Sequence, residues 1–266
     1  EVPLVELIPT EQTTDATLAT AFSLVQRQGK NAIVVNDGPG FYTTRILSFY
    51  LDEALLLLEE GADVAAVDEV MRDCGFPMGP FELLDLVGID VASTITEVMD
   101  ECLSLDRTHR RSVLMRLVER NVLGRKTNVG FYHYDAGEDD PGRGRREVNE
   151  AIYRSLGQTT RTTPSSEVIW DRLLLTMVNE AVRCLAEGVL RSPADGDLGA
   201  VFGLGFPAYL GGPFRYIDQQ GAGHIARRLR NLRHRFGRRF EPAGLLVEQE
   251  ETDATIYASS SRDHAG

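Results

Sequence analysis

Glu6 is the first residue of this sequence whose type and position suggest chemistry, because it interrupts the apolar run PLVELIP at residues 3–9. Side chains alternate between the two faces of a strand, so Glu6 would share a face with Leu4 and Ile8. A carboxylate on such a face lowers stability unless a partner or water satisfies it. One interpretation is an acid that orients and charges a histidine. The other is a glutamate at a sheet edge or strand end open to water, and the segment alone does not decide between them.

The segments around Glu6 predict the end of a doubly wound α/β sheet. Residues 2–9 are predicted as a strand, 15–29 as an amphipathic helix that ends at Gly29, and 31–37 as a second, buried strand. Such a strand, helix, strand unit is typical of a parallel sheet. From Thr44 onward apolar residues recur with helical spacing, which predicts helices at 45–61, 63–71, 80–88, 90–103 and 109–121.

An internal repeat covers most of the helical part. Residues 45–61 align with 172–188, so that Arg45 matches Arg172 and Glu53 matches Glu180. The stretch GFPMGPFELLDLVG at 75–88 parallels GFPAYLGGPFRYIDQQG at 205–221. Two matches in the same order indicate a duplicated helical domain, whose copies we expect to pack about a pseudo-two-fold axis. Glu53 and Glu180, inside apolar helices, are interpreted as buried hydrogen-bonding acids and not as catalysts.

Composition excludes several classes of function. The chain has 266 residues, a net charge of −12 and no apolar run near the roughly 18 residues of a membrane span. Its three cysteines show neither zinc nor disulfide spacing, which suggests no metal site and a reducing, cytoplasmic location. The acidic charge argues against nucleic acid as a partner. The arginine-rich segment 227–239 is interpreted as a solvated helix face that balances acidic neighbours, with anion binding as the alternative.

Four segments, in order and spacing, resemble the 3-hydroxyacyl-CoA dehydrogenase family. They are PLVELI (3–8), VVNDGPGFYTTRIL (34–47), GFPMGPFELLDLVGID (75–90) and LGRKTNVGFYHY (123–134). The second copy is similar to multifunctional α subunits of fatty-acid β-oxidation, which carry two tandem C-terminal helical domains. The resemblance implies a mainly α fold: a remnant of a Rossmann sheet (1–37), a first helical domain (38–135), a linker with a short helix (136–163), a second helical domain (164–245) and a disordered tail (246–266).

The same resemblance implies oxidation of a 3-hydroxyacyl-CoA to a 3-ketoacyl-CoA with NAD as cofactor. In the family a histidine takes the proton of the 3-hydroxyl group, and a glutamate that hydrogen-bonds this histidine corresponds to Glu6. Thr44 replaces the asparagine that helps to hold the substrate, and it is also a candidate N-cap. The family's glycine-rich loop and histidine would precede Glu1, so we expect a fragment that is inactive alone.

Three other interpretations were weighed against this one. The first is a non-catalytic helical module that binds a thiolase subunit. The second is a nucleotide site at GAGHIA (221–226), which lacks a strand before it and is explained by the repeat, where Gly221 matches Gly88. The third is another β-hydroxyacid dehydrogenase, but these use a lysine in a long helix and neither Lys30 nor Lys126 lies in one.

Overall fold

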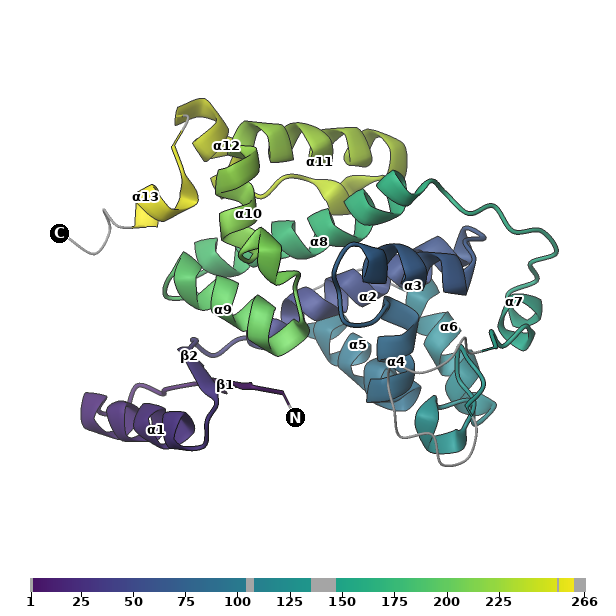
Figure 1. Ribbon diagram of the computed structural model, residues 1–266, viewed down its shortest axis with the longest axis horizontal. Helices are drawn as coiled ribbons and strands as arrows, with labels where there is room; N and C mark the ends of the chain where they lie inside the picture. The colour runs from purple at the N-terminus through teal and green to yellow at the C-terminus, as the bar shows by residue number, and fades with distance from the viewer. Residues whose placement is uncertain (1, 104–107, 135–146, 253, 261–266) are drawn as a thin grey trace. The chain divides into compact units, whose positions relative to one another are not determined.

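The computed structural model describes residues 2–103, 108–134, 147–252 and 254–260, most of them helical (Figure 1). The chain forms two compact units, Glu1–Phe49 with Leu174–Gly266 and Tyr50–Leu173. The helices α2 (Thr43–Glu59) and α8 (Ser166–Ala186) each pass from one unit into the other. Among the described residues, no helix has both the length and the apolar character needed to cross a bilayer.

The first unit begins with the predicted parallel strand pair. Strand β1 (Leu4–Leu7) pairs with β2 (Asn31–Val34) in a register that sets Glu6 opposite Ile33. Helix α1 (Asp15–Arg27) connects them and begins at Thr14, whose hydroxyl accepts the Thr17 amide. Helix α9 (Pro193–Leu204) packs on both strands. The predicted strand, helix, strand unit is therefore confirmed, with shorter strands than expected.

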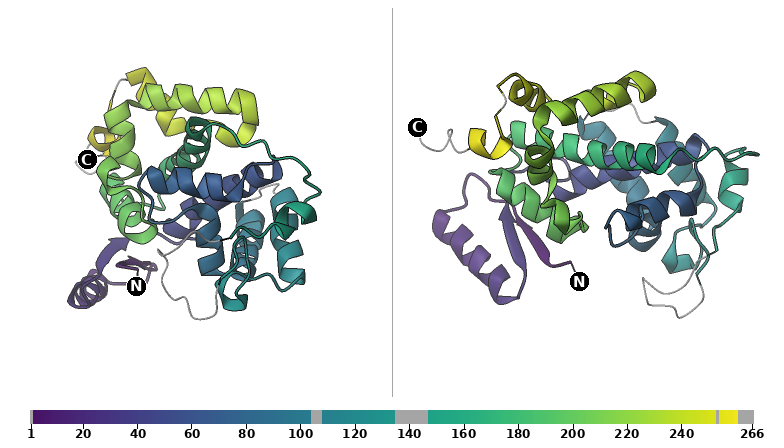
Figure 2. Two further views of the ribbon diagram at one scale, coloured as in Figure 1. Left: turned by 45° about the vertical axis from the view of Figure 1, so that its right-hand side comes forward. Right: turned by 45° about the horizontal axis from the view of Figure 1, so that its top comes forward.

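The remainder of the first unit is helical (Figure 2). It contains α10 (Pro213–Gln220), α11 (Ala222–Phe236), α12 (Gly244–Thr252), α13 (Ile256–Ser260) and the 3₁₀ turns η2 (Ala208–Leu210) and η3 (Arg238–Phe240). Helix α11 buries an apolar stripe and carries its arginines on the opposite face. Arg230 pairs with Glu250, and Arg233 with Glu241, which confirms that this face balances acidic neighbours.

The second unit contains the helices predicted for the first copy. These are α3 (Val64–Asp73), α4 (Pro80–Val87), α5 (Ile89–Leu103) and α6 (Thr108–Glu119), followed by the turn η1 (Arg125–Thr127) and the short α7 (Ala151–Ser155). Asp63 caps α3 by accepting the Ala66 amide at 3.0 Å. The sequence therefore predicted most helix boundaries to within a few residues. Residues 136–146 of the predicted linker lie outside the described residues, and its described remainder, 147–163, contains the short helix α7.

Each copy of the repeat contains the same buried aspartate with the same hydrogen bonds. Each aspartate accepts two backbone amides from the start of the next proline-led helix and one tyrosine hydroxyl. Asp68 accepts from Phe81 N (2.9 Å), Glu82 N (3.1 Å) and Tyr132 Oη (2.8 Å), and Asp197 from Phe214 N (2.8 Å), Arg215 N (3.2 Å) and Tyr257 Oη (2.7 Å). The second copy thus extends to Tyr257.

The prediction of a disordered tail at 246–266 is wrong for its described part. Helix α12 buries Leu246 and Gln249, and α13 buries Ile256. Asp218 accepts the backbone amides of Ile256 and Tyr257 at 2.7 and 3.3 Å. In the first copy, Asp85 accepts the backbone amides of Phe131 and Tyr132. In each copy, the segment that donates these two amides also contains the tyrosine that donates to the buried aspartate. The segment therefore completes the second copy.

The arginine at the start of each copy binds two glutamates of the other copy. The contacts are Arg45 Nε to Glu180 Oε1 at 2.7 Å, Arg172 Nε to Glu53 Oε1 at 2.6 Å, and the Nη atoms of Arg45 to Glu187 and of Arg172 to Glu60. Glu53 and Glu180 are each 1% exposed, which confirms their predicted role as buried hydrogen-bonding acids. Burial alone would lower the pKa of Arg45, but its hydrogen bonds to Glu187 and Glu180 outweigh burial and raise it. The two-fold axis between the copies stays a prediction.

Candidate functional site

Glu6 points from β1 to the N-terminus of α2. Its Oε1 accepts the backbone amides of Tyr42 (3.0 Å) and Thr43 (3.2 Å), and its Oε2 accepts the Thr43 hydroxyl at 2.6 Å. The first amides of a helix have no partner within the helix, and the helix dipole favours negative charge there. The half-buried carboxylate is therefore satisfied by a helix N-terminus, a partner that neither of the two initial interpretations included.

The turn between β2 and α2 brings this helix N-terminus to Glu6. Gly40 has φ of 69° and Phe41 has φ of 49°, so two successive residues adopt the left-handed conformation. Glycine adopts it readily, whereas a bulky residue such as Phe41 does so rarely and at a cost in free energy. Strained residues of this kind concentrate at functional sites. The turn places the first amides of α2 beside β1, the strand that contains Glu6.

Thr44 lies one residue inside α2, so its predicted role as N-cap is wrong. The structure assigns the capping interaction to the Glu6 carboxylate and to Thr43, a residue that sequence reasoning did not select. The Thr44 side chain is partly exposed in the first helical turn, and its hydroxyl makes no hydrogen bond within the described part of the chain. Its role in holding the substrate stays a prediction.

Helix α9 supports this site from behind. Tyr42 is fully buried and donates from its hydroxyl to the Gly196 carbonyl oxygen at 3.0 Å. Burial, with a smaller effect of nearby acidic groups, raises the pKa of Tyr42 well above its ordinary value. A Cβ at Gly199 would lie 2.9 Å from Tyr42 Cε1, and a Cβ at Gly203 would lie 3.1 Å from Thr43 Cγ2. The glycines of α9 thus allow the close approach that the Glu6 site requires.

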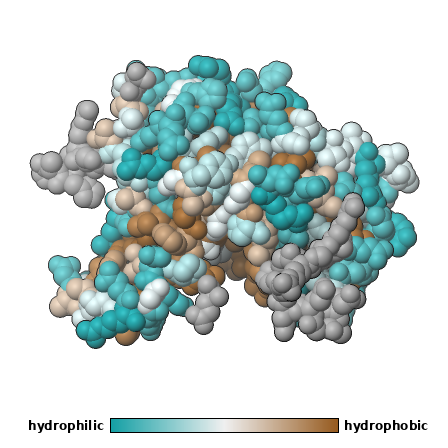
Figure 3. Space-filling model, viewed as in Figure 1, coloured by the Kyte–Doolittle hydropathy of each residue, from teal (hydrophilic) through white to brown (hydrophobic). Residues whose placement is uncertain are grey.

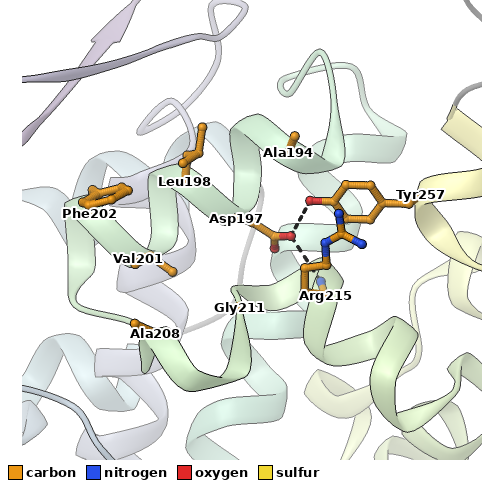
Figure 4. Close-up of a pocket in the computed structure, with 9 residues that line it drawn as sticks. All are labelled: Ala194, Asp197, Leu198, Val201, Phe202, Ala208, Gly211, Arg215 and Tyr257. Atoms are coloured by element: carbon orange, nitrogen blue, oxygen red, sulfur yellow. Dashed lines mark hydrogen bonds between the residues drawn. The ribbon is translucent and has the colours of Figure 1, made fainter. Parts of the chain in front are cut away.

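A second feature of the first unit is an apolar pocket on the other side of α9 (Figure 4). Its volume is about 400 Å³, and its apolar lining includes Leu198, Val201 and Phe202. Burial raises the pKa of Asp197 at its base to about 6, although hydrogen bonds from Tyr257 and two backbone amides oppose this shift. Arg215 lies 3.8 Å over the Tyr257 ring and close to Asp197, so its charge is compensated. The polar side chains of the pocket therefore contact one another.

Two family models match the chain. The model of the 3-hydroxyacyl-CoA dehydrogenase NAD-binding domain matches residues 1–38, and that of the C-terminal domain matches residues 40–134. Together these segments make up half of the sequence. The chain belongs to the 3-hydroxyacyl-CoA dehydrogenase family. Glu6 and the α2 N-terminus stand at the junction of the two matched domains.

Individual relatives of the chain agree with the family assignment. The fatty acid oxidation complex subunit alpha of Shewanella loihica is 42% identical over 97% of the chain, and that of Shewanella putrefaciens is 43% identical over the same share. The chain spans 36% of the length of these curated relatives.

Two solved structures are also similar. The 3-hydroxybutyryl-CoA dehydrogenase of Escherichia coli has a TM-score of 0.75 and 25% identity, covering 94% of this chain and 68% of that one. The dehydrogenase part of multifunctional enzyme 1 from Caenorhabditis elegans has a TM-score of 0.64 and 27% identity, covering 93% and 56%. The predicted fold class, mainly helical with a remnant of a parallel sheet, is confirmed.

The cofactor of this family is NAD. Dinucleotide-binding loops use glycines that let the backbone approach the pyrophosphate at a helix N-terminus. Residues 1–37 contain one glycine, Gly29, which has φ of 71° at the end of α1 and no neighbouring atom within 4 Å of a built Cβ. Gly221 begins α11 directly after another helix, α10, and not after a strand. The described residues do not form a pyrophosphate loop, so we assign no chemical step to NAD.

Proposed function

We propose that the chain forms part of an NAD-dependent L-3-hydroxyacyl-CoA dehydrogenase within a multifunctional α subunit of fatty-acid oxidation. The reaction converts a 3-hydroxyacyl-CoA to a 3-ketoacyl-CoA. The names of the Shewanella relatives and the two family models support this proposal.

The geometry of Glu6 is the observation that carries the proposal. A carboxylate oxygen can accept two hydrogen bonds. Oε1 accepts the amides of Tyr42, just before α2, and of Thr43, its first residue, whereas Oε2 accepts one bond, from the Thr43 hydroxyl. Oε2 can therefore accept a further N–H, and an imidazole N–H is the donor that the family mechanism supplies. A carboxylate held in this way fixes the histidine tautomer and stabilises the imidazolium that forms when the 3-hydroxyl proton is taken.

Thr44 is proposed to bind the substrate. Its hydroxyl is one helical residue beyond the Glu6 contact and belongs to the exposed end of α2, where backbone dipoles favour a negatively polarised oxygen. A hydroxyl can donate a hydrogen bond to the 3-oxygen of the substrate, although it lacks the carbonyl of the asparagine that it replaces.

Replacement of Glu6 by Gln in the full-length enzyme tests the proposal. Glu6→Gln keeps the shape of the side chain but removes its charge, so we expect turnover to fall by roughly 10²-fold or more while acyl-CoA binding is retained. Glu11→Gln is the matched control, because it makes the same chemical change at an exposed residue of the same unit. An unchanged kcat in Glu6→Gln would refute the role of Glu6 and the proposed function with it.

A second proposal concerns assembly, and an exposed apolar face in the second unit supports it. Apolar side chains reach the molecular surface at several places in the view of Figure 3. On α4 and α5 the exposed positions are Leu86, Val87, Val91 and Val98, with Leu86 43% and Val98 50% exposed. Because Asp85 matches Asp218, the same positions in the second copy are Gln219, Gln220, His224 and Asn231. The fold accepts polar residues there, so the apolar face is not needed for folding.

We propose that a thiolase β subunit covers this apolar face. The relatives are named as subunits of a complex, and a thiolase would consume the 3-ketoacyl-CoA product. Val91→Asp is expected to weaken co-purification of co-expressed thiolase while dehydrogenase turnover is retained. Leu24→Asp, which changes an exposed residue of α1, is the matched control. Equal co-purification of both variants would contradict the assembly proposal and leave the enzymatic one intact.

We also propose that the protein is located in the cytoplasm. None of the three cysteines, all of which the structure describes, forms a disulfide. This agrees with the reducing cytoplasm proposed from the sequence.

A further inference from the structure

We propose that Thr43 is a positioning residue that fixes the direction of the Glu6 carboxylate, an inference that rests on the proposed function of Glu6. The Thr43 hydroxyl donates to Glu6 Oε2 at 2.6 Å, the shortest of the three hydrogen bonds that reach this carboxylate. Hydrogen bonds to a carboxylate in this range are charge-assisted and stronger than those between neutral groups.

The three hydrogen bonds have different effects on Glu6. The amides of Tyr42 and Thr43 both bind Oε1 and therefore anchor one oxygen. Rotation about the last bond of a glutamate side chain is broad and nearly two-fold, so an anchor on one oxygen leaves the direction of the other loosely defined. The Thr43 hydroxyl binds that other oxygen. The plane of the carboxylate, and with it the remaining acceptor position of Oε2, is set by this single hydroxyl group.

Thr43 is itself held in one orientation by α9. A β-branched side chain in a helix has few rotamers, and threonine divides between two of them. The Thr43 methyl group lies against Gly203, where an added Cβ would approach Thr43 Cγ2 to 3.1 Å and Leu4 Cδ2 to 2.7 Å. Packing of the methyl group on α9 leaves the hydroxyl directed at Glu6. A helix of the second copy thus contributes to the geometry of the acid in β1.

The test compares variants of the full-length enzyme by steady-state kinetics. Thr43→Val keeps the branched shape and the methyl contact but removes the hydroxyl. We expect kcat to fall on the order of ten- to a hundredfold, because a small displacement of a catalytic group has an effect of this size. KM should change by less than about twofold, since substrate binding is not altered. Thr43→Ser should recover part of the lost activity, because serine retains the hydroxyl but lacks the methyl contact that directs it.

The pH profile separates positioning from a general loss of folded protein. A well-placed carboxylate raises the pKa of the histidine, so a misplaced one lets that pKa fall toward its ordinary value. The acid limb of the kcat profile in Thr43→Val should therefore move to lower pH, a change that partial unfolding does not produce. Thr20→Val makes the same substitution on exposed α1 and should leave the profile unchanged.

Two comparisons keep the inference separate from the proposed function. If Glu6→Gln is impaired but Thr43→Val has the wild-type kcat and pH profile, the Thr43 inference is overturned and the function stands. If Glu6→Gln is fully active, the proposed function fails first. If Thr43→Val does not fold, Thr43→Ser and Thr43→Ala replace it, because these two variants both lack the methyl group and differ in the hydroxyl alone. Equal turnover of that pair would also overturn the inference.

Discussion

Removal of the Arg172 guanidinium is expected to destabilise the second unit strongly. The Arg172 side chain is 0% exposed, and its Nε lies 2.6 Å from Glu53 Oε1 on a side chain that is 1% exposed. Arg172→Leu leaves the Glu53 carboxylate in a dry environment without its main counter-charge. Breaking a buried pair on one side costs about 3–5 kcal/mol. Glu60, the other acid bound by Arg172, has a side chain 44% exposed and can turn to water, so it adds little to this cost.

The double variant decides whether the pair or the packing is responsible. Arg172→Leu with Glu53→Leu removes both charges, and apolar replacement of a whole buried pair is often neutral. We therefore expect each single variant to lose about 3–5 kcal/mol and the double variant to recover most of it, with a coupling energy of about 3 kcal/mol or more. For a chain of this size the single variants should melt roughly 6–20 °C lower than wild type.

Urea unfolding followed by far-ultraviolet circular dichroism measures the four free energies of the cycle. Additive losses, with a coupling energy below about 0.5 kcal/mol, would refute the assignment of the stability to the ion pair. Arg45 and Glu180 form the matching pair in the first unit, with similar exposure and distance, but Glu180 also binds Arg183, so removal of Arg45 should cost less than removal of Arg172. A strong coupling in one pair and none in the other would show that the two copies are not energetically equivalent.

Three further predictions follow from the buried aspartates and the repeat. Burial raises the pKa of Asp68 to about 8 and those of Asp85 and Asp197 to about 6. Above pH 4 these three groups therefore bind more protons in the folded chain than in the unfolded chain, so the urea midpoint should fall as pH rises from 5 to 8.5. A constant midpoint would contradict this. Gly124→Ala should lower the melting temperature markedly, since φ is 86° and the new Cβ would lie 2.3 Å from the Asp85 carbonyl oxygen; a melting scan within a degree of wild type would disprove the clash. A crystal structure of the full-length protein should show the two copies superposing about a pseudo-two-fold axis, and copies that are separated and joined only by the linker at 136–145 would rule this out.

The site was predictable from the sequence only in part. The alternation of residues 3–9 identified Glu6, but not its partners, because the groups that donate to this carboxylate lie 36 and 37 residues later, at Tyr42 and Thr43. The dipeptide at 43 and 44 offers two identical hydroxyls, which point about 100° apart on a helix. Only the position of β1 relative to the first turn of α2 shows that Thr43, and not Thr44, reaches Glu6. A local pattern contains no information about that long-range contact.

The end of the second copy was missed for a related reason. Residues 246–257 are polar and short of apolar residues, which is typical of a disordered tail. Their order depends on two aspartates, Asp197 and Asp218, that accept hydrogen bonds from the backbone and side chain of Tyr257. The repeat contained one signal of an ordered C-terminal segment. Tyr132 follows Asp85 in the first copy, so a matching tyrosine is expected after Asp218 in the second, and Tyr257 is that residue. A single aromatic residue is too short a match to recognise without the hydrogen bonds.

The crosswise pairing of Arg45 and Arg172 with acids of the opposite copy constrains how this duplication can change during evolution. Deleting either copy would leave one arginine and two glutamates of the remaining copy without their partners in the other copy, and of these groups Glu180 would keep a contact, to Arg183. A single-copy descendant would therefore need compensating substitutions. A polypeptide cut between the copies should accordingly yield two pieces that recombine with each other more readily than either persists by itself.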